Sequence, residues 1–158
     1  MQRAMARLVH LRHRALRVAR MSPLVAAILL AVAPAALAAG PPYPDPVDGQ
    51  AVYDTANLFQ PETRSQAEGI IDAIEAQTKA EVVVYTQALG RDDISTEDAE
   101  ADAKALMDQW GVGRAGLNDG LVILFDLDTT LQHGQVQLFA GPGFSESYLS
   151  DEERQAIY

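Results

Sequence analysis

One stretch decides the fold of this chain: Asn-Asp-Gly-Leu-Val-Ile-Leu-Phe-Asp-Leu-Asp, residues Asn118–Asp128. Five apolar residues, 121–125, follow one another without a break, and acids stand on both sides of them. An apolar run this short, closed by turn residues, indicates a strand that is covered on both faces. The sequence therefore predicts an inner strand of a sheet with helices packed on it. Its carboxylates are then expected at the rim of the sheet, where ions or substrates reach them.

The flanking sequence adds helices and further strands to this inner strand. Pro61 at a first helical position opens a helix, and Ser95 with Asp98 forms a capping box that opens a second. Residues 80–86 read as a β-branched strand, and residues 135–140 follow the inner strand closely enough to form an antiparallel hairpin with it. Two apolar stripes are expected to face the sheet: Ala67, Ile70, Ile71, Ile74 and Thr78 on the first helix, and Ala99, Ala103, Leu106, Met107 and Trp110 on the second.

Charge is distributed unevenly along the 158 residues, which hold 12 basic and 22 acidic side chains. Six of the basic residues are arginines within the first 40 positions, where no acid occurs, so the remainder carries a net charge of −16. Such a body is repelled by nucleic acid, which excludes a binder of the phosphate backbone. The acid excess is compatible with cation binding and equally with a solvated surface. Cysteine is absent, which excludes disulfides, thiolate metal sites and a cysteine nucleophile.

The N-terminal segment, residues 1–38, has the layout of a secretory signal. A basic region to Arg20 precedes the apolar run Pro23–Leu37, and Ala36-Leu37-Ala38 predicts cleavage before Ala39. The competing interpretation is an uncleaved membrane anchor, since Met21–Ala39 is just long enough to span a bilayer. Both interpretations predict that the rest of the chain is exported and lies in the periplasm or elsewhere outside the cytoplasm. In the second interpretation it stays tethered to the membrane.

The predicted organisation continues with a Pro-rich linker and one domain. Residues 39–50 contain four prolines and are expected to be extended, and residues 51–158 form the domain. Ser150 and Glu153 form a capping box that predicts a last helix, yet the sequence stops about two turns later. The domain is therefore expected to be incomplete at its C-terminus.

Three motifs in register resemble the TPM domain, a family named for thylakoid, phosphatase and MOLO-type members. Val52–Phe59 (Val-Tyr-Asp-Thr-Ala-Asn-Leu-Phe) is similar to its opening motif, and Trp110–Gly120 followed by the apolar run is similar to its centre. The family's closing motif is similar to Gly141-Pro142-Gly143-Phe144 together with Leu149-Ser150-Asp151. One departure is Gln60, which stands where the family usually has a Ser or Thr helix cap. The resemblance implies an α/β fold, a three-layer α/β/α sandwich with a central mixed sheet that includes an antiparallel hairpin.

The acids that match the family motifs are Asp54, Asp119 and Asp151, each at the end of an element. Carboxylates gathered from separate loops form the ligand set that Ca²⁺ or Mg²⁺ prefers, so these three residues are the expected metal ligands. The alternative for Asp54 and Asp119 is that they bond backbone amides in their own turns. Asp151 has the simpler alternative of interacting with the dipole of its helix.

A second acidic pair, Asp126 and Asp128, ends the inner strand. An apolar strand followed by D-x-D-x-T is the nucleophile motif of haloacid-dehalogenase-type phosphatases, in which the first Asp attacks phosphorus and the second acts as acid and base. The surrounding sequence disagrees with that family, because only 30 residues follow and they contain no Lys. The alternative is a pair of acids that simply ends a strand at a hairpin turn.

The resemblance leaves two functions open. The first is an exported or membrane-tethered envelope module that binds and maintains membrane proteins, with a divalent-cation site and an envelope or membrane protein as its partner. The second is a metal-assisted acid phosphatase acting on phosphomonoesters. Family membership does not decide between a binder and an enzyme, so no catalytic residue is assigned.

Overall fold

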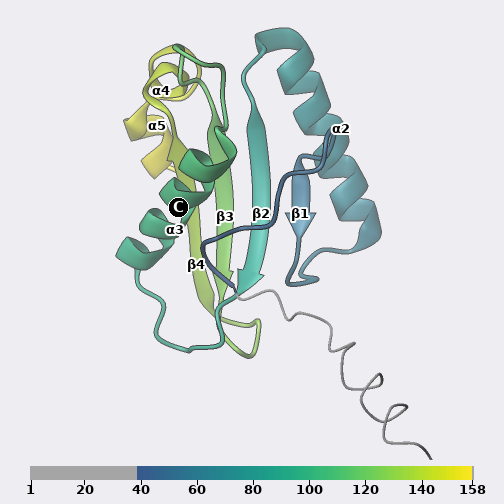
Figure 1. Ribbon diagram of the computed structural model, residues 1–158, viewed down its shortest axis with the longest axis vertical. Helices are drawn as coiled ribbons and strands as arrows, with labels where there is room; N and C mark the ends of the chain where they lie inside the picture. Colours follow the sequence, from purple (N-terminus) through teal and green to yellow (C-terminus); the bar gives the residue numbers. More distant parts are fainter. Residues whose placement is uncertain (1–38, 158) are drawn as a thin grey trace, which may run out of the picture. The chain divides into compact units, whose positions relative to one another are not determined.

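Four strands form one mixed sheet in the part of the chain that the computed structural model describes, residues 39–157 (Figure 1). The order is β1–β2–β3–β4, with bounds β1 (Val52–Asp54), β2 (Val82–Ala88), β3 (Leu121–Leu127) and β4 (Gly134–Ala140). β1, β2 and β3 run parallel, and β4 pairs antiparallel with β3. The apolar stretch is therefore an inner strand, and the predicted hairpin is confirmed.

Helices cover both faces of this sheet, which confirms the predicted α/β/α layering. They are α2 (Pro61–Thr78), α3 (Thr96–Trp110), α4 (Pro142–Ser147) and α5 (Asp151–Gln155). Successive side chains of a strand point to opposite faces, so β2 and β3 each contribute to two apolar clusters. The cluster on the α3 side includes Val83, Tyr85, Val122, Leu124 and Leu106. The cluster on the α2 side includes Val82, Val84, Leu121, Ile71 and Phe144.

The α3 helix matches its prediction closely. Ser95 and Asp98 form the capping box, and Gly111 ends the helix in the left-handed region with φ 68°. Ala99, Ala103 and Leu106 are completely buried. The stripe read from the sequence is therefore the face that packs on β3 and β4.

The α2 helix departs from its prediction on one flank. Ile71 is buried, but Ile70 is 61% exposed and Ile74 37% exposed. The carboxylate of Glu68 accepts hydrogen bonds from the backbone N–H groups of Ala51 and Val52 (3.1 and 2.9 Å), which fixes the rotation of the helix. Ile70 and Ile74 lie on the flank away from Glu68, so they do not face the sheet squarely. The Gln60 cap makes no side-chain hydrogen bond, as its identity implies.

Residues 39–50, predicted as a linker, lie against the α3 side of the sheet; we call them the N-terminal strap. Figure 1 shows this dark-blue segment crossing β2 toward β1. Tyr43 is 4% exposed, and its backbone exchanges two hydrogen bonds with the side chain of Gln109 (2.8 and 2.6 Å). The Trp110 indole donates to the carbonyl of Pro44 (2.9 Å). The strap is therefore part of the packed structure.

The predicted signal or anchor lies in residues 1–38, outside the described residues. Within residues 39–157, no helix has the length and apolar character needed to cross a membrane.

Candidate functional site

Asp54 ends β1 and is engaged by the turn that follows it. Its carboxylate accepts hydrogen bonds from the backbone N–H groups of Leu58 (2.8 Å) and Phe59 (3.0 Å) and from the Thr86 hydroxyl (2.8 Å). These donors hold the turn between β1 and α2 against the end of β2. This is the arrangement of the alternative interpretation, in which an Asp bonds amides of its own turn.

Asp119 precedes β3 and is paired with Arg114. The carboxylate is 3% exposed and accepts from the Arg114 backbone N–H (2.9 Å), from Nε (2.8 Å) and from Nη2. Hydrogen bonding to Arg114 lowers the pKa of Asp119, so the carboxylate stays ionised. Its oxygens are therefore used to close the glycine-rich loop between α3 and β3.

Asp151 stands at the start of α5 and belongs to a surface ion pair. Its Oδ1 accepts from Arg154 Nη2 (2.7 Å) and from the Ser145 hydroxyl (3.2 Å). The side chain is 76% exposed. Arg154 also donates to the carbonyl of Leu138 on β4 (2.8 Å), so this pair ties α5 to the sheet.

The structure does not bring these three carboxylates to a shared rim. Asp54 is level with Thr86 and Phe125 in the sheet register, at the C-terminal ends of the parallel strands. Asp119 lies six residues before Phe125, beyond the N-terminal end of β3. At about 3.3 Å per residue, Asp119 is therefore about 20 Å along the strand from the level of Asp54. Oxygen ligands of Ca²⁺ lie about 2.4 Å from the ion, so Asp54 and Asp119 do not hold one ion together. Nothing in the sequence indicated which end of the parallel sheet each acid would occupy.

Asp126 and Asp128 do lie near one another, but in enclosed surroundings. Asp126 is completely buried, and its Oδ1 accepts from Gln87 Nε2 (2.7 Å). Burial raises the pKa of Asp126 to about 6. Asp128 is 4% exposed and accepts from the Thr130 N–H (3.0 Å), the Thr130 hydroxyl (2.9 Å) and the Gln132 N–H (3.2 Å), while His133 Nδ1 lies 3.1 Å from Oδ2.

The pKa of Asp128 moves the opposite way to that of Asp126. Burial alone would raise it, but the bonds from Thr130, His133 and Gln132 together lower it to about 2. A phosphatase nucleophile has to reach the phosphorus atom of its substrate. Here one carboxylate is sealed in the core and the other is occupied by a hairpin turn, which is the arrangement of the simpler alternative.

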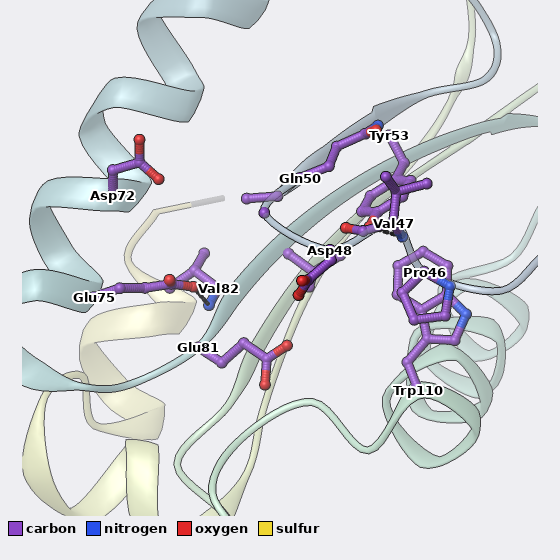
Figure 2. Close-up of a pocket in the computed structure, with 13 residues that line it drawn as sticks. Pro46, Val47, Asp48, Gln50, Tyr53, Asp72, Glu75, Glu81, Val82 and Trp110 are labelled. Carbon is purple, nitrogen blue, oxygen red and sulfur yellow. Dashed lines mark hydrogen bonds between the residues drawn. The ribbon is translucent and has the colours of Figure 1, made fainter.

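A cavity of about 350 Å³ lies between α2, the strap and the start of β2 (Figure 2). Four acids line it: Asp48, Asp72, Glu75 and Glu81. Figure 2 shows Asp72 and Glu75 projecting from α2, Asp48 on the strap opposite them, Glu81 between these two sides, and Trp110 on the far side. We call this the acid-lined cavity. Among the described residues that line it, none is basic.

The four acids differ in what they bond. Glu81 accepts from the Gly113 N–H (2.8 Å), and Glu75 accepts weakly from the Val82 N–H (3.4 Å). Asp48 and Asp72 make no hydrogen bond or ion pair within residues 39–157. Two carboxylates are therefore left for a ligand, beside the aromatic rings of Tyr53 and Trp110.

Sequence reasoning did not single out this cavity. Asp72 and Glu75 are three residues apart on a helix, which indicates a shared face but equally an ordinary solvated one. Asp48 belongs to the segment interpreted as a linker. Only the packing of the strap on the sheet brings it opposite α2, and no local pattern encodes that contact.

Within residues 39–157, no three Asp, Glu or His side chains form a group that could hold a metal ion. The predicted Ca²⁺ or Mg²⁺ stays a prediction, but the residues first assigned to it are engaged elsewhere.

Comparisons with known proteins agree with the fold. The family model described as the TPM domain matches residues 52–158. No curated protein matches the chain. Among solved structures, the chain is similar to the N-terminal domain of a protein from P. gingivalis, determined in solution, with 26% identity and a TM-score of 0.54. The match covers 69% of this chain and 64% of that one, so this chain spans less than two thirds of its structural relative.

Proposed function

Because this chain belongs to the TPM domain family, we propose that it is an exported binding module of the cell envelope that helps to maintain membrane proteins. In this proposal residues 1–38 direct the chain out of the cytoplasm and the folded domain acts there, released or tethered. The partner is an envelope or membrane protein.

The acid-lined cavity is the observation that carries this proposal. Its two uncommitted carboxylates, Asp48 and Asp72, lie in a body whose net charge is strongly negative. An acidic recess with aromatic rings in its wall is complementary to the cationic end of a Lys or Arg side chain. We propose that a basic side chain of the partner enters this cavity.

A divalent cation remains part of the proposal. Mg²⁺ usually keeps several waters, so carboxylates that are too dispersed to coordinate it directly still attract the hydrated ion. Ca²⁺ or Mg²⁺ is thus expected to compete with the basic partner for the same acidic recess.

The alternative, a metal-assisted phosphatase, has less support. Asp54 and Asp119 lie at opposite ends of the parallel strands, and Asp126 and Asp128 are enclosed. We expect no hydrolysis of a generic phosphomonoester above background, with or without Ca²⁺ or Mg²⁺. Turnover that Asp119→Asn abolished while the fold stayed intact would favour the enzyme instead.

The binding proposal is tested with the single tryptophan of the chain, Trp110, which lines the cavity. We expect the fluorescence of Trp110 to change on titration with a short Arg-containing peptide. The double variant Asp48→Asn, Asp72→Asn should weaken binding at least about tenfold, because neither carboxylate supports the fold through a hydrogen bond.

The double variant Glu97→Gln, Glu152→Gln is the matched control. Both are exposed acids that do not line the cavity, so their neutralisation changes the net charge by the same two units. Equal weakening by this control would show that the peptide responds to overall charge and would contradict a site in the cavity.

A further inference from the structure

Asp126 has a buried oxygen without a partner. Its Oδ1 is bonded to Gln87, but Oδ2 has no hydrogen-bond partner among the described residues, and the side chain is completely buried. An anionic oxygen removed from water and left unpaired is costly, so a missing donor is expected nearby.

No neighbour in the folded domain supplies that donor. Gln87 already gives its amide N–H groups to Asp126 (2.7 Å) and Asp102 (3.3 Å). The other charged or titratable groups that act on Asp126 are Asp102 and Asp98 of α3 and Arg91 of the preceding loop; the ring of Tyr43 from the strap also lies beside this cluster. Arg91 is paired with Asp98 (3.0 Å) and bonded to the Asp93 carbonyl (3.1 Å). The acids therefore outnumber the one cation, which is engaged elsewhere.

The backbone at the start of the strap reaches the same place. Gly40 is buried, and its N–H donates to Gln87 Oε1 (2.7 Å). A single amide group, that of Gln87, thus lies between the Gly40 nitrogen and Asp126. Figure 1 shows the dark-blue strap beginning beside the arrowheads of β2 and β3. Ala39 is one residue upstream, and it is the residue before which the sequence predicts cleavage.

We propose that cleavage before Ala39 creates the missing donor, and that the new terminal ammonium group forms an ion pair with Asp126. Hydrolysis of the Ala38–Ala39 bond by an endoprotease consumes one water and leaves a carboxylate on Ala38 and an amine on Ala39. That amine has an ordinary pKa near 8 and takes up a proton at neutral pH. Removal of the leader thereby fastens the strap to the sheet. The inference rests on the export and cleavage included in the proposed function.

The test compares two chains that differ by one residue. One begins at Ala39, released from a fusion partner that leaves no extra residue; the other carries one added Gly before Ala39. Both retain the sheet and both apolar clusters, which lie entirely within residues 39–157. We expect the chain that begins at Ala39 to melt about 3–8 °C higher at pH 7. An equal melting temperature would overturn the ion pair.

Two variants identify the acceptor. Asp126→Asn should abolish the difference between the two chains, whereas Asp151→Asn, which neutralises an exposed acid, should leave it unchanged. A difference that survived Asp126→Asn would overturn the assignment.

A titration of the amine makes the test independent of any variant. In the chain that begins at Ala39, the ion pair should raise the pKa of the terminal amine above its ordinary range. Where Asp126 is ionised, the added stability should be present up to about pH 8 and be lost as the pH rises through that raised pKa of the amine. An amine with an ordinary pKa would contradict the proposal.

Processing is checked separately by the mass of the exported protein. A chain that starts at Ala39 supports the cleavage, and any other start contradicts it. Failure of the cleavage, of the ion pair and of partner binding are thereby told apart.

Discussion

At the scale of single residues, Asp126 and Asp128 show how two carboxylates in one short stretch acquire opposite properties. Asp126 has one hydrogen-bond donor and is buried, so its pKa rises to about 6. Asp128 is surrounded by donors from its own turn, so its pKa falls to about 2. Burial raises the pKa of Asp126 because its one side-chain donor does not offset the loss of water, whereas the donors around Asp128 more than offset it.

The first prediction concerns Asp126 in a chain that continues upstream of Ala39. Its pKa is raised in the folded state, so its stabilising contribution is complete below pH 4 and is lost as the pH rises through 6. Asp126→Asn should therefore increase the free energy of unfolding relative to the parent, by on the order of 3 kcal/mol at pH 7 and by little at pH 4. Urea unfolding at both pH values measures this.

Asp128→Asn serves as the comparison, and it should change the free energy of unfolding in the opposite direction. The depressed pKa of Asp128 means that its contribution is present above pH 4 and is lost as the pH falls through 2. This variant should be destabilised at pH 7. If both variants changed the free energy of unfolding in the same direction at pH 7, the hydrogen-bond donors would not explain the difference between Asp126 and Asp128.

The sequence predicted that these acids end a strand, but it did not separate them. Gln87, the donor to Asp126, is 39 residues away in the chain and arrives only through the pairing of β2 with β3. The donors to Asp128 are local, at positions 130–133. Local pattern therefore indicated a turn at Asp128, while the burial of Asp126 required the fold.

At the scale of elements, the loop between α3 and β3 depends on a close approach of two glycines. A Cβ on Gly120 would lie 2.3 Å from the Val112 carbonyl oxygen, and a Cβ on Gly113 would lie 2.5 Å from the Gly120 nitrogen. Gly113 also has φ +103°, in the left-handed region. The loop can pass beside β3 only while both positions lack side chains.

The second prediction follows from that contact. Gly120→Ala should lower the free energy of unfolding by about 3 kcal/mol, because the obstructing atoms belong to the backbone and move only with the loop. Gly69→Ala is the matched control, since apart from the neighbouring backbone of α2 itself no atom lies within 4 Å of the new methyl group. It should raise stability by about 1 kcal/mol through helix propensity. Equal effects in denaturant unfolding would contradict the packing argument.

Element type and order were accessible from the sequence, because capping residues and apolar periodicity act locally. Ser95 and Ser150 have the roles predicted for them. Helix rotation was less accessible: the stripe on α2 included Ile70 and Ile74, yet Glu68 turns the helix so that Ile71 faces the core. The candidate site was predicted least well, since its geometry depends on which end of the sheet each acid occupies.

At the scale of the whole molecule, charge repulsion opposes folding. Residues beyond position 40 carry six basic and 22 acidic side chains, and the five ion pairs found in residues 39–157 leave most acids unmatched. Repulsion among exposed charges is screened over about 10 Å at 0.1 M salt.

The third prediction is a salt dependence of stability. The melting temperature should rise by roughly 2–5 °C between about 10 mM and 300 mM NaCl, because screening relieves the repulsion. A divalent chloride at matched ionic strength should raise it further if the acidic recess attracts such ions. A melting temperature that fell with NaCl would show that the ion pairs outweigh the repulsion.

The parallel arrangement of β1, β2 and β3 has a consequence for how the chain acquires its shape. Val84 on β2 is opposite Val52, 32 positions earlier, and opposite Ile123, 39 positions later. In a polypeptide that emerges N-terminus first, β2 can pair with β1, but its other edge stays unpaired and exposed until β3 is complete at position 127. Any holdase or translocation channel that handles this protein has to shield that segment for the time needed to produce the 39 residues between the end of β2 and the end of β3.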